Sequence, residues 1–401
     1  MDSITAVVKE MTEKLAPALD SLSLVVTQTV KPALKSIVAA AGPAFDSITA
    51  AAGPTIDSVT AAATEKLGPI TAVVSKTLQD LVIKQTIADA TQTLGALPIE
   101  LAMVLLLVVI CFLLLLLSCT LTLDPKYLES QTWLPSKHNA AKREWEMFSL
   151  QYTALWIAVF AVVIALQLYE SFTASSYMLL CVPLALPFLL QPLLYPLPAE
   201  RCLPLFLRYS FKANVWLAIF SFVGNYWYTH YFYSVLKASY TFPAHRLNDV
   251  PIALFFATHF YFCTYHTLAN LLLRRIETRY APGTARSLFF WGTVVAFSYF
   301  TAFMETLTIS SFPYYSFEDR FKAYTLGSAF YGLYFLVSFP VFYRIDEKVG
   351  GQAVHTVFQT CMESLGSCML VLCLLDFCRL YCGIDLHIGG LAYYVYPLYQ
   401  Q

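Results

Sequence analysis

The stretch LAMVLLLVVICFLLLLLSCTLTL, residues 101–123, decides the fold class, because it contains no charged side chain along its whole length. A helix needs about 20 apolar residues to cross the hydrocarbon core of a bilayer. Further hydrophobic runs follow at 150–168, 177–197, 212–235, 251–273, 287–310, 322–343 and 357–380. We therefore predict an all-α fold: a polytopic transmembrane helix bundle of about seven core spans, plus one N-terminal span.

The composition agrees with a membrane protein and excludes several other classes. Of the 401 residues, 58% are hydrophobic and only 13% are charged, with a formal net charge of −1, and the mean hydropathy is +0.60. Without a basic run, a nucleic-acid partner is not expected. The 10 cysteines fall mostly in apolar runs and show no CxxC or Cys/His spacing, so we predict neither a metal site nor a disulfide framework.

Residues 1–97 form a separate, repetitive segment. The string AGPAFDSITA at 41–50 recurs eleven residues later as AGPTIDSVTA, and prolines stand at 17, 32, 43, 54 and 69. Eleven residues make about three helical turns, so each copy returns to the same face. We predict an amphipathic helical tail broken at its prolines. It is either an arm that binds a lipid surface or a partner, or a helical hairpin or partly disordered leader.

The domain boundaries follow from these patterns. The tail occupies 1–97, an N-terminal transmembrane anchor 98–124, and a polytopic domain 140–385. Loops after the first, third and fifth spans are rich in Lys and Arg, which predicts that they are cytoplasmic. The tail would then be lumenal, unless the first hydrophobic run dips into the membrane instead of crossing it.

Polar residues recur at helical spacing within three consecutive spans, and residues three or four apart share a helix face. We predict that the three polar faces meet. The residues are Asn225, Tyr226, His230 and Tyr233 in the fourth span, His259, Cys263, His266 and Asn270 in the fifth, and Ser298, Thr301, Glu305 and Thr308 in the sixth.

A carboxyl group in lipid is expected to stay protonated near neutral pH unless it meets a cation. Glu305, which we place near the middle of its span beside the Ser and Thr hydroxyls, is therefore a candidate acid. The alternative is a hydrogen bond between helices, or a salt bridge with His259 or His266. Lone polar residues in membrane helices often have that structural role. Asp346 and Glu347 suggest a solvated loop.

Several chemistries lack their motifs. The sequence has no HxxxH or HxxHH box, no glycine-rich dinucleotide fingerprint, no P-loop and no GxSxG. We therefore expect no cofactor, and acid–base proton transfer remains. Tyr226, Trp227 and Tyr233 lie inside a span and suit a flat, lipid-like ligand, although such rings also form belts at the membrane surface.

Three long strings carry a resemblance to a known family. FSFVGNYWYTHYFYSVLKASYTFP (220–243), METLTISSFPYY (304–315) and YFLVSFPVFYRIDE (334–347) resemble the cycloeucalenol cycloisomerases, and the likeness covers roughly residues 140–385. The resemblance implies an isomerase of the endoplasmic reticulum membrane that opens the 9β,19-cyclopropane ring of a sterol, converting cycloeucalenol to obtusifoliol. It implies nothing about the tail or the first span.

The site residues are hypotheses from physical chemistry. Glu305 is the candidate acid, and His259, His266 or His230 the candidate base. The candidate substrate-binding residues are Asn225, Tyr226, Trp227, Tyr233 and Asn270. Two alternatives stay open: a sterol double-bond isomerase of related mechanism, and a non-enzymatic sterol-binding membrane protein. The expected partners are the sterol and the lipid bilayer, and the sequence predicts no particular oligomeric state.

Overall fold

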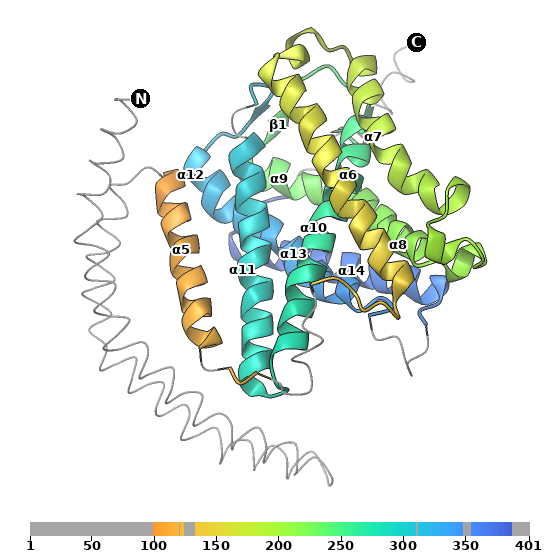
Figure 1. The fold of residues 1–401 in the computed structure, drawn as a ribbon. Helices are drawn as coiled ribbons and strands as arrows, with labels where there is room; N and C mark the ends of the chain where they lie inside the picture. Colours follow the sequence, from red (N-terminus) through yellow and green to blue (C-terminus); the bar gives the residue numbers. More distant parts are fainter. Residues whose placement is uncertain (1–98, 120, 124–132, 310–311, 348–353, 387–401) are drawn as a thin grey trace, which may run out of the picture. The chain divides into compact units, whose positions relative to one another are not determined.

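The computed structural model describes residues 99–119, 121–123, 133–309, 312–347 and 354–386. The repetitive tail lies outside the described residues. The described part is mostly helical (Figure 1). Its helices are α5 (Ile99–Ser118), α6 (Ala140–Ala165), α7 (Ala174–Leu194), α8 (Tyr209–Val223), α9 (Thr229–Leu236), α10 (Ile252–Arg279), α11 (Thr284–Ile309), α12 (Arg320–Lys322), α13 (Ser328–Tyr343) and α14 (Val357–Tyr381).

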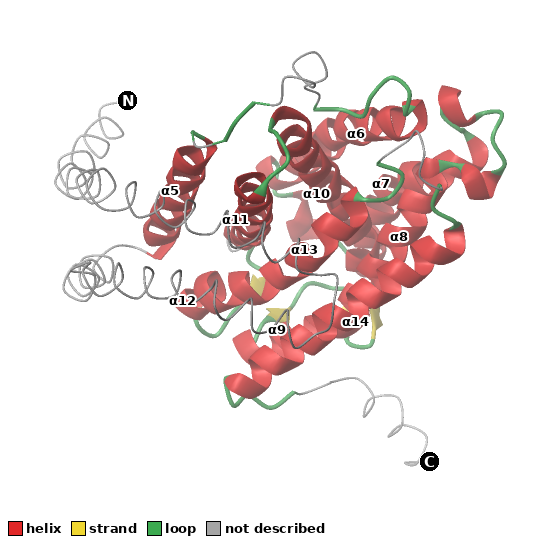
Figure 2. Cartoon of the chain, turned by 90° about the horizontal axis from the view of Figure 1, so that it is seen from below, coloured by secondary structure: helices red, strands yellow, loops and turns green. Residues whose placement is uncertain are grey.

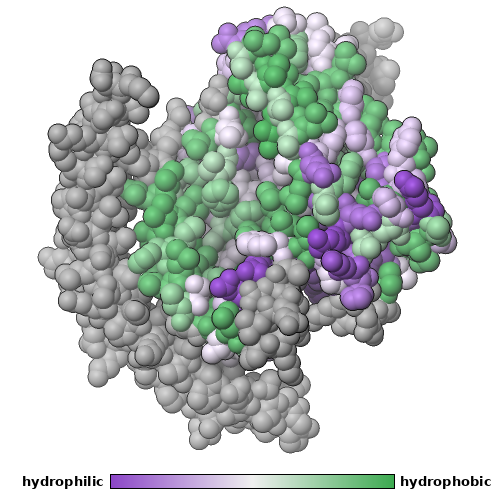
Figure 3. Space-filling model, in the orientation of Figure 1, coloured by the Kyte–Doolittle hydropathy of each residue, from purple (hydrophilic) through white to green (hydrophobic). Residues whose placement is uncertain are grey.

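Five helical segments among the described residues are long and apolar enough to cross a membrane. They are Ala140–Ala165, Ala174–Glu200, Thr284–Ile309, Ala323–Tyr343 and Val357–Tyr381. Hydrophobic residues cover much of the described face in Figure 3, and hydrophilic residues gather in patches, mainly toward its lower right. These helices confirm the prediction of an all-α, multi-pass membrane protein. They do not confirm the expected count of about eight spans.

The chain divides into two units, and the larger comprises Ile99–Ile110, Leu123–Ala281 and Phe290–Gln401. Within it, α10 is the central helix: it packs against α6, α7, α8 and α13 (Figure 2). Small residues make this possible, since Ala253, Ala257 and Ala269 are all buried on α10. α14 closes the bundle by packing on α8 and α13.

Two π-helical turns interrupt the bundle, and sequence periodicity predicted neither. Gly224–Tyr228 joins α8 to α9, and Ala323–Gly327 joins α12 to α13. Such turns insert an extra residue into a helix and occur frequently at functional sites. The second turn packs against α9. A β-carbon placed on Gly327 would lie 2.7 Å from Cδ1 of the buried Leu236.

Four short strands complete the described fold. β1 (Ser239–Tyr240) pairs antiparallel with β4 (Tyr315–Ser316), and Tyr240 lies opposite Tyr315. β2 (Arg246–Leu247) and β3 (Val250–Pro251) form a hairpin. Its two turn residues, Asn248 and Asp249, have φ of 51° and 60°, as tight hairpin turns require. The pairing of β1 with β4 brings two tyrosines together from segments 75 residues apart (315 − 240).

We predict that Gly327→Ala lowers the midpoint of thermal unfolding in detergent, because overpacking of this kind costs about 1–3 kcal/mol. Gly366→Ala on α14 is the matched control, since a β-carbon there meets nothing within 4 Å. Alanine also has the better helix propensity, so this control should be neutral or stabilising. Equal midpoints for the two variants would show that Leu236 yields freely.

Candidate active site

Glu305 lies near the end of α11, four residues before Ile309. The expectation that Glu305 lies near the middle of its span was therefore wrong, because the residue is close to the C-terminal end of the helix. The carboxylate atom Oε2 accepts a hydrogen bond from the Tyr331 hydroxyl of α13 at 2.7 Å. The Tyr265 hydroxyl of α10 also lies beside this carboxyl group. Helices α10, α11 and α13 thus meet at one acid.

The hydroxyl groups on the same face of α11 have other partners. Thr301 donates to the backbone carbonyl of Phe297, and Thr308 donates to the backbone carbonyl of Glu305 itself. The buried Ser298 hydroxyl has no hydrogen-bond partner within the described residues. The two threonine hydroxyls thus bond back to the backbone of their own helix, as helical Ser and Thr residues often do.

Six tyrosines lie close enough to Glu305 to interact with it electrostatically, and we call them the tyrosine cluster. They come from α10, α13 and the pair of strands β1 and β4. The members are Tyr240, Tyr261, Tyr265, Tyr315, Tyr331 and Tyr334.

The rings of the tyrosine cluster pack on one another. Tyr240 stacks on Tyr315 with ring centroids 4.4 Å apart. Tyr331 meets Tyr334 edge to face at 4.9 Å. Such contacts hold the rings in fixed orientations. The result is a rigid, electron-rich wall around one carboxyl group.

The carboxyl group and most of the cluster keep some accessible surface. Glu305, Tyr265, Tyr331, Tyr240 and Tyr315 are half-buried, as is Tyr261. Tyr334 is buried behind them with 4% exposure. Aromatic faces also stabilise a cation placed against them.

The structure does not bring His259 or His266 to Glu305. His259 is buried, and its Nε2 lies 3.1 Å from Oδ1 of Asn214 on α8. His266 is also buried; its Nδ1 lies 2.8 Å from the Phe262 carbonyl and its Nε2 2.9 Å from the Ser338 hydroxyl. No interaction that the structure describes joins either imidazole to the acid.

His230 is buried on α9 beside the β2–β3 turn at Asn248 and Asp249. Its ring packs edge to face on Tyr233 at 5.6 Å. Tyr233 in turn lies 6.2 Å from Tyr240, a member of the tyrosine cluster. Of the residues predicted in the fourth span, Tyr233 therefore contacts the cluster directly and His230 borders it through Tyr233.

The other predicted sterol-binding residues of this span have different surroundings. Asn225 is buried and donates to the Ser221 carbonyl. The Tyr226 ring stacks on Phe222 at 5.8 Å. Trp227 is 40% exposed, as expected of a residue that faces lipid.

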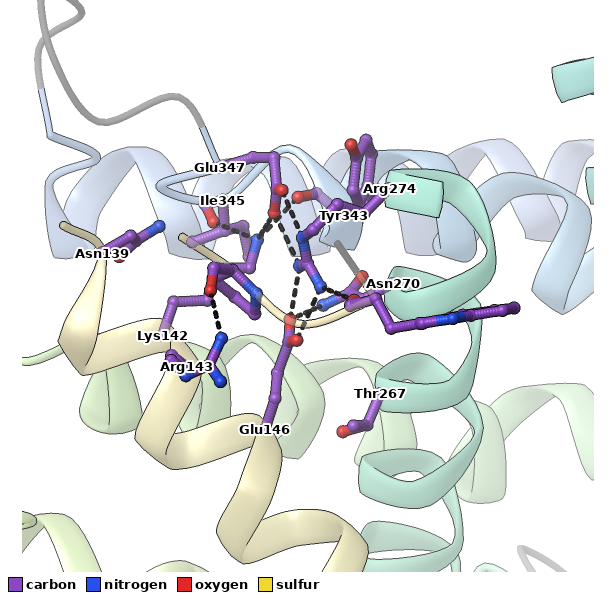
Figure 4. A network of polar contacts seen from close by, with 12 residues as sticks. Asn139, Lys142, Arg143, Glu146, Thr267, Asn270, Arg274, Tyr343, Ile345 and Glu347 are labelled. Carbon is purple, nitrogen blue, oxygen red and sulfur yellow. Dashed lines mark hydrogen bonds and ion pairs between the residues drawn. The ribbon is translucent and has the colours of Figure 1, made fainter. Parts of the chain in front are cut away.

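Asn270 belongs to a second polar site, which we call the charged network (Figure 4). Asn270 donates to Glu146 at 2.9 Å. Arg274 pairs with Glu146 at 2.8 Å and with Glu347 at 2.6 Å. Lys142 pairs with Glu347 at 2.8 Å. The charged network consists of Lys142, Glu146, Asn270, Arg274 and Glu347.

The prediction that Asp346 and Glu347 lie in a solvated loop was wrong. The Glu347 side chain is 12% exposed, and the 8%-exposed side chain of Asp346 pairs with buried Lys212. Burial by itself raises the pKa of Asp346, but hydrogen bonds from His355 and Lys212 outweigh it and lower the pKa below its ordinary value. A lowered pKa in the folded state means stabilisation at neutral pH, which is lost as the pH falls through that pKa.

The charged network and the tyrosine cluster lie at opposite ends of the bundle. On α13, the chain runs from Tyr331 at the cluster to Tyr343, whose backbone carbonyl accepts from Lys142 at 2.8 Å. Twelve helical residues span about 18 Å. Asn270 is therefore part of a structural site remote from Glu305.

Comparison with known proteins gives one significant relative. The chain is 43% identical over 248 residues to the cycloeucalenol cycloisomerase of Arabidopsis thaliana, and the match covers 61% of this chain and 88% of the relative. The chain belongs to the cycloeucalenol cycloisomerase family. Membership makes it an isomerase and agrees with the resemblance of its three long strings. No protein-family profile matches the chain, and no solved structure does.

Sequence reasoning singled out Glu305 but missed the tyrosines around it. Tyr315 and Tyr334 stand inside the strings that carry the likeness to cycloeucalenol cycloisomerases, at 304–315 and 334–347, which was the available signal. Tyr265 precedes His266 by one residue. Periodicity drew attention to the histidine, whereas the tyrosine faces the acid.

We predict that Lys142→Met lowers stability by about 3–5 kcal/mol, the usual cost of breaking a buried ion pair. The Lys142 ammonium also donates to the carbonyls of Tyr343 and Ile345, at 2.8 and 2.7 Å. Arg379→Met is the control, because the carboxylate of its partner Asp376 is 40% exposed. Exposed pairs contribute about 0–1 kcal/mol. Chemical unfolding in one detergent compares the two, and equal losses would contradict the prediction.

Proposed function

We propose that this protein opens the 9β,19-cyclopropane ring of a sterol, converting cycloeucalenol to obtusifoliol, by proton transfer within the endoplasmic reticulum membrane. The observation that carries the proposal is a single carboxyl group, Glu305, set among six tyrosines. Family membership supports the class of reaction. The relative's name supplies the substrate.

The reaction needs a proton at the ring methylene, and the bond that breaks leaves positive charge on the adjacent ring-junction carbon. Loss of a neighbouring proton then forms a double bond. Glu305 is the proposed donor, and Tyr331 and Tyr265 orient its carboxyl group. A positioned general acid typically accelerates such a step by about 10²–10⁴-fold. The overall change is redox-neutral, so the proposal includes no cofactor.

The rings of the tyrosine cluster have a second role in this proposal. Each aromatic face can stabilise a desolvated cation by roughly 0.5–2 kcal/mol. Tyr331, Tyr265 and the stacked pair Tyr240 and Tyr315 come from four different segments of the chain, α13, α10, β1 and β4. They can therefore surround the charge from several sides. Tyr233, which packs on Tyr240, extends the surface offered to the apolar sterol skeleton.

The proposed isomerase domain is 140–385, with 98–124 as an added span and 1–97 as a tail. The span is more than an anchor in this proposal. Met103 and Leu107 of α5 are buried with Phe303 and Tyr324. Phe303 is two residues from Glu305 on α11, so α5 supports the segment that carries the acid.

We predict that Glu305→Gln binds sterol but loses ring opening by about 10²–10⁴-fold, because an amide cannot deliver the proton. Glu277→Gln is a matched control: the Glu277 carboxylate also accepts from a tyrosine hydroxyl, that of Tyr343 at 2.7 Å, but near the C-terminal end of α10, about three turns beyond Tyr265. Turnover of the cyclopropyl sterol by purified protein, without added cofactor, is measured by mass spectrometry.

Parental turnover by Glu305→Gln would refute the assignment of the acid. A reaction in heavy water adds an independent check on the proposed function. The new angular methyl group takes its third hydrogen from the acid, so product made in heavy water should contain deuterium in that group, up to one atom per molecule. A shifted double bond with the cyclopropane intact would instead indicate a sterol double-bond isomerase.

A further inference from the structure

Ring opening requires a proton acceptor as well as a donor, and the surroundings of Glu305 restrict the choice. The titratable groups facing it are Tyr261 and Tyr265 from α10, Tyr331 and Tyr334 from α13, Tyr240 from β1 and Tyr315 from β4. A neutral phenol is a poor proton acceptor, and the phenolate that would be a good one forms only near pH 10 in water.

Among the described residues, neither the arginine near the cluster nor the three histidines supply the proton acceptor. Arg246, which donates to the backbone carbonyl of Tyr240, has no acceptor atom on its side chain. His259 and His266 are bound to Asn214 and Ser338 inside the bundle. His230 is separated from the cluster by Tyr233. Once Glu305 has given up its proton, its own carboxylate is the strongest acceptor at hand.

We infer that Glu305 is both the acid and the base of the reaction, an inference that rests on the proposed function. The carboxyl group protonates the bridging methylene, and the carboxylate formed by that step removes the proton from the neighbouring ring carbon.

The geometry of the substrate fits one group acting twice. The bridging methylene (C19) and the carbon that loses its proton (C8) are each bonded to the same ring-junction carbon (C9). In the usual steroid skeleton the hydrogen on C8 points to the β face, where the 9β,19 bridge also lies. One carboxyl group on that face can reach both positions without the sterol turning over.

The steps balance without another reactant. The electron pair of the C9–C19 bond takes the proton from the carboxylic acid, which leaves a cation at C9 and a carboxylate at Glu305. The electron pair of the C8–H bond then forms the C8–C9 double bond, and the proton goes to the carboxylate. Glu305 ends protonated and ready for the next molecule.

Tyr331 and Tyr265 are positioning residues in this scheme. The Tyr331 hydroxyl donates to the carboxyl group and the Tyr265 hydroxyl lies beside it. Hydrogen bonds to an ionised carboxylate are about twice as strong as those to a neutral group. The two tyrosines therefore stabilise the carboxylate during the lifetime of the cation. They restrain its rotation between the two transfers.

The dependence of kcat on pH tests the inference in the full-length protein. Separate acid and base residues give a bell-shaped profile, because one must be protonated and the other not. A single carboxyl group needs only to be protonated, so kcat should level off toward low pH and fall tenfold per pH unit above one ionisation. Unfolding measured over the same pH range marks where the protein is intact.

A label-transfer experiment accompanies the profile. Cyclopropyl sterol deuterated at C8 is mixed in ordinary water with undeuterated sterol that carries a heavy side chain. Glu305 removes a deuteron from the first sterol. If it keeps that deuteron until the next sterol binds, some of the product with the heavy side chain should carry deuterium in its angular methyl group.

A plot of kcat against pH that only descends, together with label transfer, supports a single group acting as both acid and base. A bell-shaped profile with methyl hydrogen only from water would overturn the inference and leave the proposed function standing. Absence of any ring-opened product from the parental protein would refute the proposed function and, with it, this inference.

Discussion

Arg274 is the side chain on which the bundle depends most directly. It leaves α10 and binds Glu146 of α6 and Glu347 beyond the end of α13, so three segments are tied to one guanidinium group. A buried charge left without its partners is strongly destabilising. The planar guanidinium can bind two carboxylates at once, which the compact ammonium group of a lysine does less well. These ion pairs therefore restrict how α6, α10 and α13 can be arranged.

The position of the charged network has consequences at the other end of the bundle. α10 and α13 are joined at the network and run side by side to the tyrosine cluster. There each presents a tyrosine, Tyr265 and Tyr331, to Glu305 of α11. A general acid must be held at a definite place to be effective. Rigid pairing at one end helps to keep the two hydroxyls at a constant spacing at the other.

The two polar sites illustrate different treatments of charge in a membrane protein. In the charged network, every ionised group has a partner of opposite sign, which offsets part of the cost of burying its charge. Around Glu305 the structure describes hydroxyls and rings but no ion-pair partner. That environment favours a carboxyl group that keeps its proton until a substrate accepts it. Structural stability and proposed chemistry are thereby assigned to separate ends of the same helices.

The sequence by itself determined the membrane class and the positions of most of the long helices, and it singled out Glu305 as the candidate acid. Hydrophobic length and the cost of burying a carboxyl group are local properties that need no knowledge of neighbours. The family likeness was also readable in its long strings. Sequence reasoning correctly placed the three histidines on helices.

Only the tertiary structure decided what each face meets. Tyr265 and His266 are adjacent in sequence, but neighbouring residues on a helix point about 100° apart, so one contacts Glu305 and the other Ser338. Asn270 belongs to the same face as His266 but lies at the level of Glu146. The stacked pair Tyr240 and Tyr315 arises from strand pairing across 75 residues (315 − 240). The helical period determines in which direction each side chain points from its own helix. Which other segment lies in that direction depends on packing and on buried ion pairs between distant parts of the chain.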